Sequence, residues 1–263
     1  MSPLDSELYG KLWNPLTYWQ EYYAFRGEAF PADEWKIRSF VVRTLRSWGK
    51  RFERAVDLGC GPTVHNLFAF APHVAVFDLL DYNSRNLEEI QKWRSGRADI
   101  DYTAYIDATL RAEGRRDVSA TDMQHREAVT RAMVGELDVF DMRSPASVGR
   151  HQGYELATLF WSLEILSRLE QDWWLALESV KSVLAPDGRI ILAVLLDSEG
   201  YSIRDLRYPC LNVSYDDVCE WLTAGGFRLD TAMHEFVTHG DLSGVPACAN
   251  LERSSVLFAA SRV

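Results

Sequence analysis

Residues 55–63 read Ala-Val-Asp-Leu-Gly-Cys-Gly-Pro-Thr, an apolar strand that runs directly into a turn with two glycines and a proline. Gly59 and Gly61 lack a β-carbon, so they allow positive φ and a close approach of backbone N–H groups to a ligand. Pro62 cannot extend the strand and suits the start of a helix that Thr63 can cap. The pattern indicates a nucleotide-binding turn, although a G-x-G alone fits a plain structural turn about equally well.

The next predicted strand ends in an acidic residue. The apolar run 74–80 leads into Asp81, about 20 residues after the glycine turn, where Rossmann-type sites usually hold a ribose diol. The turn lacks the third glycine that lets a helix pack against a pyrophosphate, which disfavours a dinucleotide-dependent oxidoreductase. A ligand with a ribose but no phosphate at this place explains the pattern better. S-adenosylmethionine is the commonest such cofactor.

Composition narrows the class of protein. The 263 residues are 47% hydrophobic and 25% charged, as in one ordinary globular domain. The formal charge of -10 disfavours nucleic acid or an anionic membrane as the main partner and suits a neutral or cationic small molecule. The four cysteines form no C-x-x-C pair and lie at no zinc spacing, so we expect reduced thiols, no metal and a cytoplasmic protein. No membrane-spanning run or export leader is expected.

The first half of the chain predicts a cap, the start of a sheet and an insertion. Residues 1–50 contain an aromatic segment around an Asn-Pro pair, which suits either a cap helix packed on the core or a lid over a ligand, and then an amphipathic helix over 33–48. Further elements are predicted as helices over 64–71 and 84–95 and a strand over 73–80. An insertion over 97–135 interrupts the alternation of strands and helices, with a loop at 114–117 and a helix over 121–134.

The second half completes the sheet. The strand predicted over 136–142 places Asp141 at a carboxyl end, the edge where open α/β sheets bind ligands. The other elements are predicted as strands over 154–160, 189–196, 227–237 and 254–261, helices over 171–184 and 214–224, a turn over 185–188 and a polar loop over 197–201. Five βα units and a terminal strand pair predict an α/β fold, namely a Rossmann-like, seven-stranded class I methyltransferase sheet in a single domain over residues 1–263.

Five stretches together resemble one family across almost the whole chain. They are the segment 13–23, the turn 59–63, the run 81–87 with its later Trp93, the inserted helix before Asp141, and 161–164 (Trp-Ser-Leu-Glu). These stretches resemble the small-amine methyltransferases, the family of nicotinamide, phenylethanolamine and indolethylamine N-methyltransferases and thioether S-methyltransferase. The N-terminal Asn-Pro with its tyrosines is more specific for this family than the glycine turn.

The resemblance implies a set of cofactor-binding residues. Tyr18 and Tyr23 close over the cofactor, and Asp81 takes the ribose hydroxyls. Asp141 accepts a hydrogen bond from the adenine amine. The remaining implied cofactor residues are Gly59, Gly61, Thr63, Tyr82, Asn86, Met142, Thr158 and Phe160. His65 stands where the family often has a tyrosine near the carboxylate of the cofactor. It either keeps that hydrogen bond or is a histidine on a helix surface.

The resemblance also implies acceptor-binding residues. Glu164 matches a carboxylate near the amine, and Glu252 falls near a second acidic position, so both are candidate catalytic groups that orient an ammonium and take its proton. Otherwise Glu164 is a solvated residue at a helix start and Glu252 a turn carboxylate. Tyr18, Tyr201 and Asp197 are further candidates for substrate contact. The residues after 196 match the family only loosely.

The expected activity is methyl transfer from S-adenosylmethionine to a small amine or N-heterocycle, with S-adenosylhomocysteine as product. An O-, S- or C-methyltransferase would keep every cofactor residue, and a non-catalytic protein that binds S-adenosylmethionine is a further alternative. A monomer is expected, with a dimer as the alternative.

Overall fold

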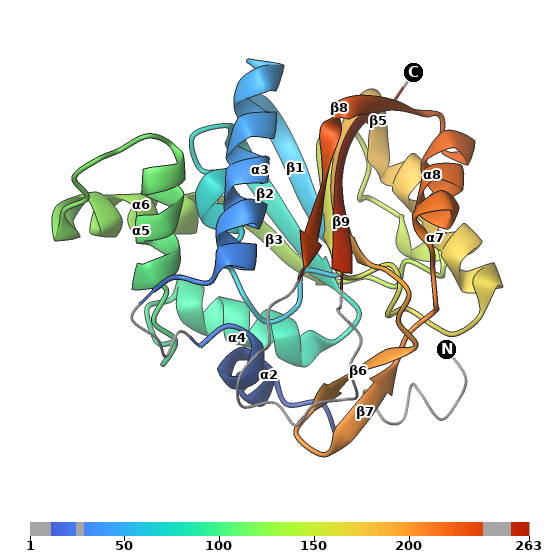
Figure 1. Cartoon of the computed structure of the whole chain (residues 1–263), viewed down its shortest axis with the longest axis horizontal. Coiled ribbons are helices and arrows are strands. Elements are labelled where there is room, and N and C mark those ends of the chain that lie inside the picture. Colours follow the sequence, from blue (N-terminus) through green and yellow to red (C-terminus); the bar gives the residue numbers. More distant parts are fainter. Residues whose placement is uncertain (1–11, 25–28, 239–253, 263) are drawn as a thin grey trace.

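The computed structural model describes residues 12–24, 29–238 and 254–262, and its centre is a seven-stranded sheet in the order β3-β2-β1-β4-β5-β9-β8 (Figure 1). The strands are β1 Phe52–Leu58, β2 Val74–Asp81, β3 Val134–Val139, β4 Tyr154–Phe160, β5 Leu184–Leu195, β8 Phe227–Thr238 and β9 Ser254–Arg262. The strands β1 to β5 pair in parallel, whereas β9 is antiparallel to both of its neighbours. This arrangement confirms the predicted seven-stranded sheet with its terminal strand pair.

Helices cover both faces of the sheet, so that each face carries its own apolar core. One core takes side chains from α3 Ala32–Trp48, α4 Ser84–Arg94, α5 Thr103–Ala112 and α6 Ala120–Met133, and the other from α7 Glu170–Val183 and α8 Tyr215–Ala224. Successive residues of β1 alternate between them, because Ala55 belongs to the first core and Val56 to the second. This double covering explains why the parallel strands read as nearly continuous apolar runs.

Two small elements lie together at one end of the sheet. Helix α2, Pro15–Tyr22, has Pro15 at its first position, and its N-cap Asn14 accepts a hydrogen bond from the Thr17 N–H at 3.0 Å. The hairpin of β6, Gly200–Ile203, and β7, Leu206–Pro209, lies beside it (Figure 1). The Tyr22 hydroxyl donates to the Ser202 carbonyl at 2.6 Å, which joins the two elements.

The helix predicted over 64–71 is wrong. The chain there makes only the 3-10 turn η1, Leu67–Ala69, before it enters β2. Four consecutive side chains, Leu67 to Phe70, are buried, and the His73 carbonyl already pairs with the Phe52 N–H at 2.8 Å. Tight turns therefore replace a regular helix in this short and largely buried connection.

Four other segments differ from the sequence-based expectation. The structure adds α5 to the insertion, and the polar loop over 197–201 leads into the β6–β7 hairpin. The turn expected at 185–188 lies within β5 as a register shift, since Tyr154 pairs with Leu184 and Leu156 with Arg189. Strand β3 ends at Val139, so Asp141 lies two residues beyond it. Turns and short strands depend on long-range pairing that local patterns do not contain.

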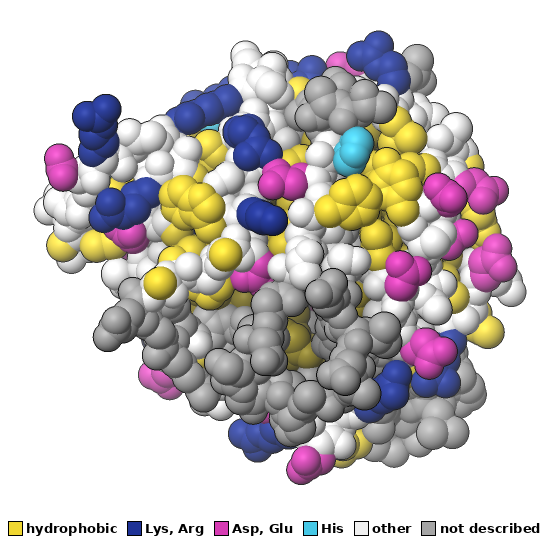
Figure 2. All heavy atoms as spheres, in the orientation of Figure 1, with side chains coloured by type: hydrophobic (Ala, Val, Ile, Leu, Met, Phe, Trp, Pro, Cys, Tyr) yellow, Lys and Arg dark blue, Asp and Glu magenta, His cyan; other side chains and the backbone are white. Residues whose placement is uncertain are grey.

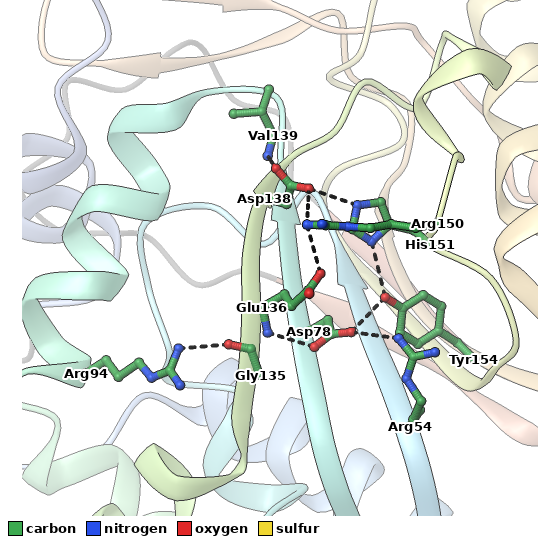
Figure 3. Close-up of polar contacts among 10 residues, drawn as sticks. All are labelled: Arg54, Asp78, Arg94, Gly135, Glu136, Asp138, Val139, Arg150, His151 and Tyr154. Atoms are coloured by element: carbon green, nitrogen blue, oxygen red, sulfur yellow. Dashed lines mark hydrogen bonds and ion pairs between the residues drawn. The ribbon is translucent and has the colours of Figure 1, made fainter.

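A polar network around the buried Asp78 carboxylate connects β1, β2, β3 and β4 (Figure 3). The Asp78 carboxylate accepts hydrogen bonds from the Arg54 guanidinium at 3.1 Å, the Tyr154 hydroxyl at 2.8 Å and the Glu136 N–H at 2.8 Å. His151 then bridges Tyr154 and Asp138 at the end of β3. The network anchors both ends of the loop 140–153, which carries Asp141.

Three further observations concern the surface, the helices and the cysteines. On the face shown in Figure 2, basic and acidic side chains both occur, with several acidic side chains along the right of the view. Arg43 and Glu235 form one surface ion pair. None of the helices in the described ranges is both long and apolar enough to cross a membrane. Cys60 and Cys219 are free thiols, the Cys210 thiol donates to the Ser198 carbonyl at 3.6 Å, and Cys248 lies outside the described residues.

Candidate active site

A cavity of about 230 Å³ lies where the carboxyl ends of β1, β2, β4 and β5 meet. Its floor is the glycine turn after β1, and its roof comes from the N-terminal segment and the hairpin. Because the carboxyl ends of parallel strands share one edge of a sheet, side chains far apart in the sequence converge there. Most of the predicted site residues line this cavity: Tyr18, Tyr23, Gly59, Gly61, Thr63, His65, Asp81, Tyr82, Asp141, Met142, Phe160, Glu164 and Tyr201.

The glycine turn has the backbone conformation that its sequence predicted. Gly59 and Gly61 have φ values of 73° and 63°. A β-carbon on Gly59 would lie 2.5 Å from the Ser162 β-carbon, whereas one on Gly61 would meet nothing within 4 Å. Gly59 is therefore required by close packing and by conformation, and Gly61 by conformation alone.

Asp81 ends β2 beneath the turn and is buried. Its Oδ2 accepts from the Gly61 N–H at 2.8 Å, and its Oδ1 accepts from the Asn83 N–H at 2.8 Å and the Asn86 amide at 3.1 Å. Burial raises the pKa of Asp81, and these three hydrogen bonds oppose the rise. A carboxylate has about four acceptor positions, so Asp81 can accept a further hydrogen bond from a ligand in the cavity.

Asp57 is a site residue to which the sequence pattern gave no role. It lies on β1 just before the glycine turn and lines the cavity, where its Oδ1 accepts from the Thr158 hydroxyl at 2.8 Å. Burial raises the pKa of Asp57 to about 7, and the charge of Asp81 acts in the same direction. Thr158 itself is completely buried and does not line the cavity, so its visible role is to hold Asp57.

One end of the cavity is built from tyrosines and a buried histidine. The hydroxyl groups of Tyr18 and Tyr23 lie 3.1 Å apart, and the Tyr23 ring centroid lies 4.2 Å from that of His65. His65 Nδ1 lies 2.9 Å from the Thr63 hydroxyl oxygen, while its buried Nε2 has no hydrogen-bond partner among the described residues. His65 is 3% exposed, so a histidine on a helix surface is excluded.

The electrostatics at this end keep the histidine neutral. Burial lowers the pKa of His65 well below its ordinary value, and the nearby Arg38 charge lowers it further. Arg38 is itself buried and pairs with Glu34 at 3.0 Å. A neutral imidazole has one N–H donor and one acceptor nitrogen. If the Thr63 hydroxyl donates to Nδ1, Nε2 is left as a donor.

Asp141 forms an ion pair with an arginine that was not predicted from the sequence. The Arg143 guanidinium donates to both carboxylate oxygens of Asp141, at 2.8 Å each, and also lies 5.1 Å from the centroid of the Tyr82 ring. The hydrogen bonds to Asp141 raise the pKa of Arg143. All three side chains line the cavity. The only sequence signal for Arg143 was its position two residues after Asp141.

Glu164 is the most deeply buried carboxyl group that lines the cavity, with 1% exposure. Its Oε1 accepts from the Leu195 N–H at 3.0 Å, and its buried Oε2 has no partner among the described residues. Burial raises the pKa of Glu164 to about 7 despite that hydrogen bond. Helix α7 begins only at Glu170, so the alternative of a solvated residue at a helix start is wrong.

Of the remaining predicted residues, Asn86 and Asp197 do not line the cavity. Asn86 is completely buried and makes its contacts with Asp81 and Trp13. Asp197 is exposed and does not line the cavity. Glu252 lies outside the described residues. The roles assigned to these three residues stay predictions, whereas Trp13 and Tyr22 are lining residues that the sequence reasoning did not name as candidate site residues.

A family model settles which family this is. The model described as the NNMT/PNMT/TEMT family matches residues 3–244. The chain belongs to this family. Membership makes it an S-adenosylmethionine-dependent methyltransferase, as the resemblance implied.

Relatives and solved structures agree with this assignment. The chain is 24% identical to phenylethanolamine N-methyltransferase of Macaca mulatta over 74% of its length and 69% of the relative. It is 22% identical to indolethylamine N-methyltransferase of Oryctolagus cuniculus and 24% identical to nicotinamide N-methyltransferase of Sus scrofa, each over 86% of both chains. The crystal structure of magnesium protoporphyrin IX methyltransferase from Synechocystis PCC 6803 with bound S-adenosylhomocysteine covers all of both chains at a TM-score of 0.57 and 12% identity, which supports the fold.

Proposed function

We propose that this enzyme transfers a methyl group to the nitrogen of a small amine or N-heterocycle. The observation that carries the proposal is Glu164, a buried carboxyl whose Oε2 has no partner among the described residues, in a cavity otherwise roofed by aromatic side chains. An ionised carboxylate in such a place is costly unless a positive charge or a hydrogen-bond donor pairs with it. An ammonium group supplies both.

The protein has to hold the acceptor and exclude water. S-adenosylmethionine supplies the methyl group as an activated sulfonium, and the transfer is an in-line displacement by the acceptor lone pair. Asp81 and Asp141 would hold the adenosyl part. The glycine turn, Thr63, His65 and Tyr23 would hold the methionine part, where the neutral imidazole suits a carboxylate through Nε2–H.

Glu164 prepares the acceptor for transfer. An ammonium N–H breaks and a Glu164 O–H forms, which frees the nitrogen lone pair. With a pKa of about 7, Glu164 is poised near neutral pH, where a general base combines a useful ionised fraction with a useful basicity. Tyr18, whose pKa is raised by burial and by the charges of Tyr22 and Glu164, stays a neutral phenol beside the carboxylate. The aromatic roof offers flat surfaces to the body of the acceptor.

The test is a screen of matched acceptors with S-adenosylmethionine, read by mass spectrometry. Small primary and secondary amines and aromatic N-heterocycles are compared with alcohols, phenols and thiols of the same carbon skeleton. We expect methylated products from amines, with turnover lost in Glu164→Gln while S-adenosylhomocysteine still binds. Product from thiols or phenols and none from amines would overturn the proposal in favour of an O- or S-methyltransferase. Cytoplasmic location and a monomeric state stay predictions.

A further inference from the structure

A buried chain of hydrogen bonds connects Asp81 to the roof of the cavity. The Asn86 side-chain amide donates to Asp81 Oδ1 at 3.1 Å, and Asn86 Oδ1 accepts from the Trp13 indole N–H at 2.7 Å. Asn86 is completely buried, and Trp13 is 4% exposed. Because the indole nitrogen can only donate, it fixes which side of the Asn86 amide faces Asp81.

The Trp13 ring is also the centre of the roof. It lies 4.9 Å from the Tyr18 ring and 5.7 Å, edge-on, from the Tyr208 ring of β7. Tyr18 in turn shares a hydrogen bond with Tyr23. Trp13 lines the cavity and precedes α2 by two residues. One side chain therefore contacts both the support of Asp81 and the aromatic cover over the acceptor side.

We propose that Trp13 is a positioning residue that aligns the Asp81 carboxylate for the ribose hydroxyls through Asn86 and couples cofactor binding to closure of the aromatic roof. The inference rests on the proposed ribose role of Asp81. When Asp81 is held by its ribose ligand, Asn86 and Trp13 are held with it, and the ring fixes Tyr18 in place. Removal of the indole N–H leaves the Asn86 oxygen buried without a donor and frees the amide to turn away from Asp81.

The experiment compares two ligands on the full-length enzyme by calorimetry. The ligands are S-adenosylhomocysteine and its analogue that lacks both ribose hydroxyl groups. The variants are Trp13→Phe, Asn86→Ala and the double variant, with Asp81→Asn as the reference for ribose recognition. Trp174→Phe is the matched control, because Trp174 donates its indole N–H to Glu170 at 3.3 Å in an exposed hydrogen bond, and neither residue lines the cavity.

We expect the wild-type enzyme to prefer the ribose-containing ligand, and Trp13→Phe to reduce this preference about 10-fold, the effect of a lost buried hydrogen bond. Asn86→Ala should reduce it similarly, and the double variant should add little because both act through one chain. A purely structural role of Trp13 would weaken both ligands equally and leave the preference unchanged, which would overturn the proposal. If Trp13→Phe and Asp81→Asn both keep the wild-type preference, the ribose assignment of Asp81 itself is refuted.

Hydrogen exchange tests the coupling to the roof without any measurement of activity. The amide of Tyr18 donates to the Asn14 carbonyl, and those of Tyr23 and Ala24 donate to the Trp19 carbonyl. S-adenosylhomocysteine should slow exchange at these amides in the wild-type enzyme and in Trp174→Phe. Trp13→Phe at saturating ligand should show much less slowing. Equal slowing in wild type and Trp13→Phe would refute the coupling.

Discussion

Replacement of Glu164 by Gln separates the cost of a buried charge from its use in catalysis. Glu164 has a folded-state pKa of about 7, against an ordinary value of 4.5. Between these pH values the carboxyl is ionised in the unfolded chain but protonated in the fold, so the folded state binds more protons. The free energy of unfolding therefore falls as pH rises through this window. The total loss is about 3 kcal/mol at pH values above the folded pKa, since each pKa unit is worth about 1.4 kcal/mol.

Gln has nearly the same shape and cannot ionise, so the variant escapes this loss. The difference in unfolding free energy between Glu164→Gln and wild type should grow by about 3 kcal/mol, in favour of the variant, from acid pH to above the folded pKa. The assay is denaturant unfolding at a series of pH values. The control is Glu178→Gln, because Glu178 is 58% exposed and its ion pair among the described residues is with Lys181, so the gain that burial causes at Glu164 should be absent.

The same substitution should act oppositely on turnover. We expect kcat to fall by about 10²- to 10⁴-fold, the usual contribution of a general base. The affinity for S-adenosylhomocysteine should stay within a few-fold of wild type. In the wild-type enzyme, kcat/KM should rise with pH through an inflection near 7, and this limb should be missing in the variant. A pH-independent stability difference together with unchanged turnover would refute both the burial argument and the proposed role.

Three further comparisons of variants test the site and the fold. Gly59→Ala should cost several kcal/mol in chemical unfolding because the new β-carbon meets Ser162, whereas Gly61→Ala should cost only the roughly 1–2 kcal/mol of positive φ; equal costs would contradict the packing argument. Arg143→Ala should reduce the preference for S-adenosylhomocysteine over its inosine analogue in calorimetry, because the Asp141 carboxylate, which we propose to accept from the adenine amine, loses its support; an unchanged preference would refute this proposed adenine contact. Asp78→Ala should lower the unfolding free energy by about 1–3 kcal/mol, since it leaves the buried Tyr154 hydroxyl and the part-buried Arg54 and Glu136 donors without their acceptor, whereas loss of the exposed Arg150 pair should cost below about 1 kcal/mol; similar values would count against the network around Asp78 (Figure 3).

The sequence by itself determined the sheet and the position of its ligand edge. Strand periodicity and the two glycines placed the turn, and Asp81 ends its strand as predicted, whereas Asp141 lies two residues beyond β3. The sheet and the turn could be predicted because each depends on neighbours within a few residues, and because parallel strands bring their carboxyl ends to one edge. Family resemblance added Tyr18, Tyr23 and Glu164, all of which line the cavity.

Only the tertiary structure decided which of these groups are buried and what holds them. The pKa of Glu164 depends on its burial and on Leu195, 31 residues later, and the bond between Trp13 and Asn86 spans 73 residues. The exposed position of Asp197 and the missing helix after the glycine turn likewise follow from packing elsewhere in the chain. Burial and long-range hydrogen bonds arise only when distant segments meet, so no local pattern in the sequence contains them.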